Sequence, residues 1–151
     1  MNETIASAPR SSAPWHLWAV GLISLLWNCY GGYDYAMSHL GGREFFQSMG
    51  LDEEAFTWFQ AMPAWATAAW AIGVWFSVIG SILLLARSRH AATAFLVSLI
   101  GAAISFAYQF TSDRPASLEG TEMVVMPLVI LIAIVLQWYY ARRMIAAGVL
   151  R

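Results

Sequence analysis

Four apolar stretches run through the 151 residues of this chain, and each is long enough to cross a lipid bilayer as a helix. A bilayer core of about 30 Å requires about 20 apolar residues in a helix. Lipid offers no partner to an unpaired backbone amide, so such stretches fold as helices. The sequence therefore predicts an all-α polytopic membrane protein, with four transmembrane helices in an antiparallel bundle at about residues 15–37, 64–85, 91–110 and 123–147.

Charged residues are nearly absent from these stretches. They make up 11% of the chain, whereas hydrophobic residues make up 60%, and a soluble domain carries about 25% charged residues. Asp34 is the one charge inside the first three stretches, and the fourth has none before Arg142. The composition excludes an ordinary soluble helical bundle and predicts a single membrane domain over residues 15–147.

The charges are divided unequally between the two sides of the predicted bundle. One side carries six of the eight basic residues, all arginines, and one of the nine acidic residues, and the other side carries the rest. Basic residues accumulate on the cytoplasmic side of membrane proteins. We therefore expect both termini in the cytoplasm, as an N-terminal tail at 1–14 and a C-terminus at 148–151. The connections at 38–62 and 111–122 are expected to lie outside.

The two outer connections differ in character. In residues 52–62, Ala55, Phe56 and Phe59 recur at helical spacing after acidic residues that suit a helix N-terminus. We expect a short amphipathic helix there, lying on the outer surface of the membrane. An ordinary structured loop is the alternative. Residues 111–122 are polar and are predicted to be flexible.

Small residues form stripes along the predicted helices, mostly at intervals of four. Such spacing places them on one helix face, and small faces let helix backbones approach closely in lipid. We predict that these stripes hold the bundle together, and a homodimer contact is the alternative. The helix-packing candidates are Ser24, Gly32, Ala69, Gly73, Ser77, Ser81, Ser98, Gly101 and Ser105.

Polar side chains inside the apolar stretches are candidates for function, because burying them in lipid is costly. Asp34 shares the outer depth of the membrane with several aromatic and amide side chains, which predicts one outward-opening pocket. The alternative for Asp34 is a headgroup position, solvated or paired with Arg43 or Arg114. For Asn28 and Gln137, interhelical hydrogen bonds are favoured over ligand binding. The candidate polar pocket consists of Asn28, Tyr30, Asp34, Tyr35, Tyr108 and Gln109.

No group of residues in the sequence predicts a catalytic site, a cofactor or a metal. His16, His39 and His90 lie at the ends of the predicted helices, whereas a membrane haem needs histidines within them. No cysteine–histidine cluster has zinc spacing, and no phosphate loop or nucleophile motif occurs. No basic patch supports nucleic-acid binding. The chain is predicted not to be an enzyme, and its single cysteine, Cys29, to be a packing residue.

Four stretches carry a resemblance to a known family. They are LLWNCYGGYDYAM at 25–37, MPAWATAAWAIGVW at 62–75, GSILLLARSRHAATAFLVSLIG at 80–101 and VVMPLVILIAIVLQWYYARRMIAAGVL at 124–150. Together they cover most of the chain, and the order of elements matches throughout. The chain resembles an uncharacterised family of small bacterial integral membrane proteins with four helices, some of which are labelled sugar transporter. The resemblance implies that architecture and transfers no catalytic or binding residue.

These features favour one function and leave a second open. The favoured function is an accessory or scaffold subunit of the bacterial inner membrane, which packs against other membrane proteins or itself. This function is favoured because the loops are short and stripes of small residues are abundant. The alternative is a transporter of a small solute, such as a sugar, that acts as a homo-oligomer. An enzyme is disfavoured because no acid–base or nucleophile set stands out. The lipid bilayer is the expected partner in either case, and nucleic acid in neither.

Overall fold

A computed structural model describes residues 12–151 as an all-helical molecule, and that range contains no strand. Residues 1–11, and with them most of the predicted tail at 1–14, lie outside the described residues. The all-α prediction is confirmed. The elements are α1 (Trp15–Leu40), α2 (Gly42–Ser48), α3 (Glu53–Gln60), α4 (Ala64–Leu85), α5 (His90–Thr111), the 3-10 helix η1 (Ala116–Leu118) and α6 (Thr121–Ala146).

Three of these helices, α4, α5 and α6, are long and apolar enough to cross a membrane. At about 1.5 Å per residue, the 22 residues of α4 or α5 extend for about 33 Å. α1 has 26 residues, but its composition is less apolar because it includes Asn28, Asp34 and three glycines. The three candidate spans among the described residues thus support the prediction of a helical membrane protein.

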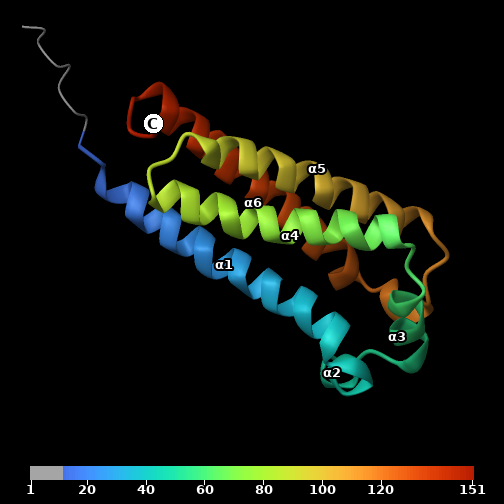
Figure 1. Ribbon diagram of the computed structural model, residues 1–151. Helices are drawn as coiled ribbons and strands as arrows, with labels where there is room; N and C mark the ends of the chain where they lie inside the picture. The colour runs from blue at the N-terminus through green and yellow to red at the C-terminus, as the bar shows by residue number, and fades with distance from the viewer. Residues whose placement is uncertain (1–11) are drawn as a thin grey trace, which may run out of the picture.

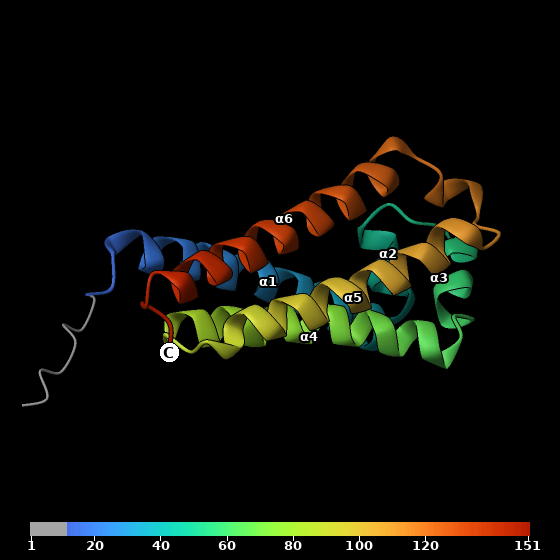
Figure 2. The same ribbon diagram turned by 90° about the horizontal axis from the view of Figure 1, so that it is seen from above.

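The four long helices run up and down in antiparallel order (Figures 1 and 2). α4 lies between α1 and α5, and α6 packs against α5. The turn between α4 and α5 is short, and Arg87 within it has a left-handed backbone conformation, with φ of 58°. α4 and α5 therefore form a helical hairpin, with α1 packed along α4 and α6 packed along α5.

α4 and α5 pack backbone against backbone at Gly73 and Gly101. A Cβ atom on Gly73 would lie 2.9 Å from the amide nitrogen of Ala102, and one on Gly101 would lie 2.7 Å from the amide nitrogen of Gly73. The hydroxyl of Ser98 donates a hydrogen bond of 2.5 Å to the carbonyl oxygen of Gly73. Neither glycine position has room for a side chain, so this contact depends on the small residues that form it.

The short elements α2, α3 and η1 form a cap at one end of the bundle (Figure 1). Its apolar side chains make a separate small core, in which Phe46 and Leu118 are fully buried. The Oδ1 atom of Asp52 accepts hydrogen bonds from the amide of Ala55 (2.8 Å) and the hydroxyl of Ser117 (2.9 Å). These two bonds stabilise the carboxylate and therefore hold the pKa of Asp52 below its usual value. The bond from the Ala55 amide has the larger effect.

The cap differs from the sequence prediction in two respects. The amphipathic helix expected at 52–62 is α3, with Asp52 as its N-cap, but α2 before it is not predicted. The seven residues of α2 are too few for a periodic signal. The polar segment 111–122 is more than a loop, because it contains η1, which buries Leu118 in the cap core, and Ser117 bonds to Asp52.

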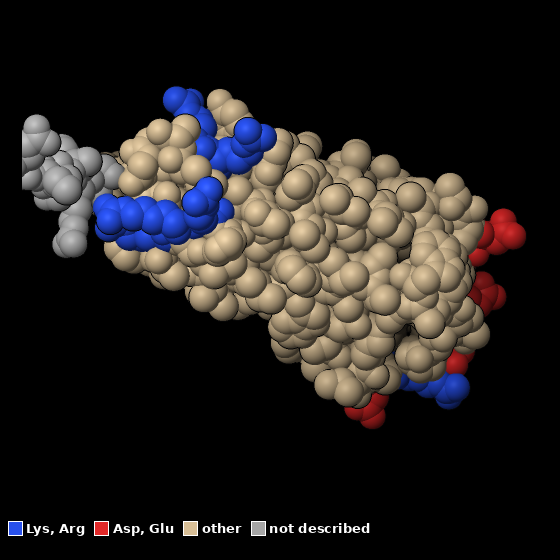
Figure 3. Space-filling model, turned by 45° about the horizontal axis from the view of Figure 1, so that its top comes forward, with Lys and Arg blue, Asp and Glu red and all other residues tan. Residues whose placement is uncertain are grey.

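Charged side chains gather at the two ends of the molecule (Figure 3). Acidic residues lie at the cap end. The arginines at the opposite end follow α4 or lie in the last turns of α6 and beyond it, and they are Arg87, Arg89, Arg142, Arg143 and Arg151. Within the described residues, the bundle therefore has a basic end and an acidic end.

The residues after α6 fold back onto the basic end. The amide of Arg151 donates a hydrogen bond of 2.9 Å to the carbonyl oxygen of Arg87, and the amide of Arg89 donates one of 2.8 Å to that of Arg151. Val149 and Leu150 are buried in the core cluster at this end. Residues 148–151 are thus a packed part of the bundle.

Candidate functional site

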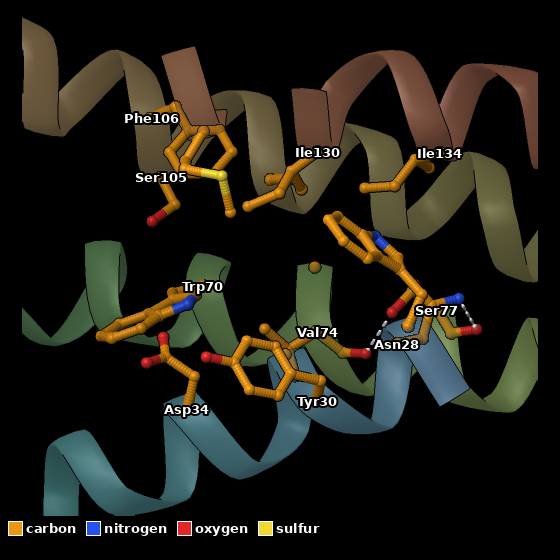
Figure 4. A pocket seen from close by; sticks show the side chains of 15 residues that line it. Asn28, Tyr30, Asp34, Trp70, Val74, Ser77, Ser105, Phe106, Ile130 and Ile134 are labelled. Atoms are coloured by element: carbon orange, nitrogen blue, oxygen red, sulfur yellow. Dashed lines mark hydrogen bonds between the residues drawn. The ribbon is translucent and has the colours of Figure 1, made fainter. Parts of the chain in front are cut away.

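All four long helices line a central cavity of about 260 Å³ (Figure 4). Its wall is mostly apolar, with Asp34 and a few amide and hydroxyl groups among the aliphatic and aromatic side chains. The lining residues are Trp27, Asn28, Tyr30, Gly31 and Asp34 of α1, Trp70, Gly73, Val74 and Ser77 of α4, Ala102, Ser105 and Phe106 of α5, and Met126, Ile130 and Ile134 of α6.

The cavity reaches the molecular surface between α1 and α6. Tyr30 of α1 and Met126 of α6 line it and are 67% and 46% exposed, whereas Gly73, Ser77 and Ser105 on α4 and α5 are buried. α4 and α5 therefore form its floor. Asp34 lies toward the acidic end of α1, so the cavity occupies the half of the bundle nearer the cap.

Asp34 turns its carboxylate into this cavity, and Figure 4 shows the hydroxyl of Tyr30 pointing into the same space. Neither predicted arginine partner reaches it. Arg43 forms an ion pair of 3.0 Å with Glu53, and the guanidinium of Arg114 lies over the ring of Phe110. Within residues 12–151, Asp34 has no hydrogen-bond or ion-pair partner. The alternative of a structural pair with Arg43 or Arg114 is therefore wrong.

Asn28 closes the end of the cavity nearer the basic side. Its Nδ2 atom lies 3.1 Å from the carbonyl oxygen of Ser77, 2.9 Å from the hydroxyl of Ser81 and 3.2 Å from Oε1 of Gln137. The bond to Gln137 joins α1 directly to α6, so the interhelical hydrogen bonding predicted for Asn28 and Gln137 is confirmed. Further toward the basic end, Nδ1 of His16 lies 2.6 Å from the hydroxyl of Tyr140, which joins the same two helices.

Three of the six predicted pocket residues line the cavity and three do not. Asn28, Tyr30 and Asp34 line it. Tyr35 instead packs its ring against Trp70, with the ring centroids 5.0 Å apart. Inclusion of Tyr35 is therefore wrong, because it projects from a different face of α1 than Asp34.

Tyr108 and Gln109 also lie outside the cavity lining. The ring of Tyr108 stacks on Trp58 of α3, and the Nε2 atom of Gln109 donates to the hydroxyl of Ser105 at 3.3 Å. Both residues lie in the last turn of α5, near the cap end, as expected. Their inclusion is nevertheless wrong, because α5 presents Ala102 and Ser105 to the cavity, and Tyr108 and Gln109 lie about one turn further along.

Trp27 and Trp70 line the cavity although neither was chosen as a site residue. A sequence signal for them does exist. Trp27 and Gly31 lie four positions apart on α1, with Asp34 three positions further, so all three share one helix face. On α4, Trp70 and Val74 also lie four positions apart and so share one helix face. Grouping polar residues with the aromatic residues on their own helix face would have identified both tryptophans.

The nine predicted helix-packing residues are all buried in the structure. Gly73, Gly101 and Ser98 form the contact between α4 and α5, and Gly32 faces the ring of Trp75, which a Cβ atom would meet at 3.6 Å. The others are Ser24, Ala69, Ser77, Ser81 and Ser105, of which Ser77 and Ser105 also line the cavity.

Within the described residues, no group of three or more histidine, cysteine, aspartate or glutamate side chains is placed to hold a metal ion. Comparison with known proteins finds no match to this chain among protein families, curated proteins or solved structures. The candidate site is an open cavity with one carboxylate, that of Asp34.

Proposed function

We propose that this chain is a small-solute transporter of the bacterial cytoplasmic membrane. It spans the membrane four times, has both termini in the cytoplasm and acts as a homo-oligomer. The solute enters the central cavity from the outer side. The observation that carries this proposal is a cavity lined by all four long helices that is open between α1 and α6 and blocked at Asn28.

α1 supplies the fourth span of this proposal. Its 26 residues extend for about 39 Å at about 1.5 Å each, which exceeds a bilayer core of about 30 Å. It packs along α4. Asn28, the most polar group near its middle, directs its amide into the bundle and away from lipid. The length and packing of α1 thus support a transmembrane position despite its lower hydropathy.

The separation of charge supports a cytoplasmic position for both termini. Five arginines lie at the basic end of the described residues, whereas Arg43 and Arg114 lie at the acidic end among the carboxylates. Arginine excess marks the cytoplasmic side of membrane proteins. The cap of α2, α3 and η1 then lies outside, and the cavity opens in the outer half of the membrane.

A binding site in the outer half of the bundle that Asn28 closes at its inner end fits transport by alternating access. Two hydrogen bonds, Asn28 to Gln137 and His16 to Tyr140, link α1 to α6 on the inner side of the cavity. Breaking both would let α1 and α6 separate there. Four helices are few to enclose a complete path, and a second copy of the chain would close the opening between α1 and α6.

Accessibility of a cysteine in the cavity tests this proposal. We expect Val74→Cys, in a Cys29→Ala background, to react with a membrane-impermeant methanethiosulfonate reagent in right-side-out vesicles and hardly at all in inside-out vesicles. A thiol in lipid stays neutral, and only the thiolate reacts, so Ile132→Cys on the lipid-facing side of α6 is expected to react more than about tenfold more slowly.

A matched pair of glycine variants controls for access through the cavity. Gly31 and Gly120 both have open space where a Cβ atom would go, but Gly31 lines the cavity and Gly120 lies in the outer loop. Gly31→Leu is expected to protect Val74→Cys from the reagent, and Gly120→Leu is not. Equal rates for Val74→Cys and Ile132→Cys would rule out solute entry into this cavity.

The exposure of α6 favours a second candidate function. Among the 18 consecutive residues of α6 that are most apolar, 11% are buried inside the described molecule, whereas the corresponding share for α5 is 44%. Lipid covers such a surface in a lone protein, and a helix of another protein covers it in a complex. An accessory or scaffold subunit that packs against a larger membrane complex through α6 is the role that this observation supports.

A further inference from the structure

We infer that the central cavity takes a small organic cation, with a positively charged nitrogen held by Asp34 and an apolar body held by Trp27, Tyr30 and Trp70. This inference rests on the proposed function, because it names the class of solute for the same cavity. It depends on the charge, the lining and the size of the cavity, and on the state of its polar groups.

The charge of the cavity selects for a cation. Within residues 12–151, Asp34 is the one charged side chain in the lining, and neither Arg43 nor Arg114 compensates it. A carboxylate in mostly apolar surroundings attracts a cation more strongly than one in water, because the local dielectric is low. The same field disfavours an anionic solute.

The aromatic lining favours an organic cation. Trp27, Tyr30 and Trp70 line the cavity with Asp34, and Figure 4 shows Trp70 and Tyr30 at the same end of it as the carboxylate. The faces of aromatic rings attract alkylammonium groups, and tryptophan does so most strongly. A metal ion is a poor fit, because calcium takes about 6–8 oxygen ligands and the described residues offer no cluster of carboxylates.

Two polar groups of the cavity, the amide of Asn28 and the hydroxyl of Ser77, already donate hydrogen bonds within the bundle, which leaves fewer partners for a polyhydroxylated solute such as a sugar. Asn28 uses its amide hydrogens on Ser77, Ser81 and Gln137. The hydroxyl of Ser77 donates to the carbonyl oxygen of Val74. A sugar would leave most of its hydroxyls without partners in an apolar wall, and each unpaired hydroxyl is costly.

The volume limits the size of the solute. A cavity of about 260 Å³ lies just below the range of about 300–1,000 Å³ that holds drug-sized ligands. A quaternary or tertiary ammonium with a short chain fits this space. Large aromatic cations do not fit without movement of α1 or α6.

Choline and its neutral isostere 3,3-dimethylbutan-1-ol test the inference directly, because they share a shape and differ in charge. Binding to the purified full chain in detergent is measured by calorimetry. We expect choline to bind at least about tenfold more tightly than the isostere. Asp34→Asn is expected to remove that preference, whereas Glu44→Gln, which neutralises an exposed carboxylate on α2, is expected to leave it unchanged.

Each other outcome contradicts the inference in a way that separates it from the proposed function. If choline and the isostere bind equally and Gly31→Leu abolishes both, the cavity takes solutes without selecting cations. If choline fails to bind wild type while Val74→Cys still reacts from outside, the cavity admits solutes of another class. If neither binding nor Val74→Cys labelling occurs, the proposed function fails as well.

Discussion

Replacement of Gly73 by leucine is expected to destabilise the bundle by at least about 3 kcal/mol, at the upper end of the range for overpacked cores. A Cβ atom at this position would lie 2.9 Å from the amide nitrogen and 3.1 Å from the Cα atom of Ala102. These are backbone atoms, so no rotation of a side chain relieves the contact. α4 and α5 would have to separate, and the Ser98 hydrogen bond to the Gly73 carbonyl would be lost.

Thermal unfolding of the purified protein in detergent measures this effect. Gly120→Leu makes the same chemical change in open space and is expected to melt like wild type. Asp34→Asn is expected to have little effect, because no described residue pairs with Asp34. A Gly73→Leu protein that extracts and melts like wild type would refute the close contact between α4 and α5.

Replacement of Asn28 by leucine is expected to cost about 2 kcal/mol and to open the inner end of the cavity. The change keeps the number and branching of the heavy atoms in the side chain but removes all three hydrogen bonds of Asn28. It leaves the buried Gln137 without this partner, and an unsatisfied buried polar group costs about 1–3 kcal/mol. Single interhelical hydrogen bonds in membranes average about 0.6 kcal/mol, so the three contacts together account for the larger value.

A double-mutant cycle with Gln137→Leu isolates the link between α1 and α6. The double variant is expected to be more stable than the sum of the single changes indicates, because no unpaired amide remains. In the Val74→Cys background, Asn28→Leu is expected to let the thiol reagent react from the inner side as well. Additive free energies together with unchanged one-sided labelling would show that Asn28 does not seal the cavity.

The long helices were predictable from the sequence because hydrophobicity over about 20 residues defines a membrane span. α4 begins and ends at the residues expected, and α5 begins one residue before the expected range and ends one residue after it. The nine predicted helix-packing residues are buried in the structure, and at Gly73 and Gly101 only small side chains fit where the backbones meet. α2 and η1 were missed because they are shorter than any periodic signal and are held by the tertiary contacts of Phe46 and Leu118.

The cavity was only half predictable, because depth in the membrane is easier to derive from a sequence than helix rotation is. Tyr35 is next to Asp34 in the chain and shares its depth, but it projects from a different face of α1 and packs against Trp70. Trp27 and Trp70 were not chosen as site residues, although their spacing from Gly31 and Val74 places them on the cavity face. The inward direction of the Asp34 carboxylate depends on how α1 is rotated against α4, which no local pattern specifies.

Gentle extraction of the protein from its native membrane, followed by mass measurement of the intact particle, tests the central claim most directly. We expect a homo-oligomer without foreign subunits, which carries a small cationic molecule. That molecule is expected to be absent from the Gly31→Leu particle and retained in the Gly120→Leu particle. A particle that holds a second polypeptide in fixed stoichiometry, with the same small-molecule content in wild type and Gly31→Leu, would contradict it. The chain would then be an accessory subunit.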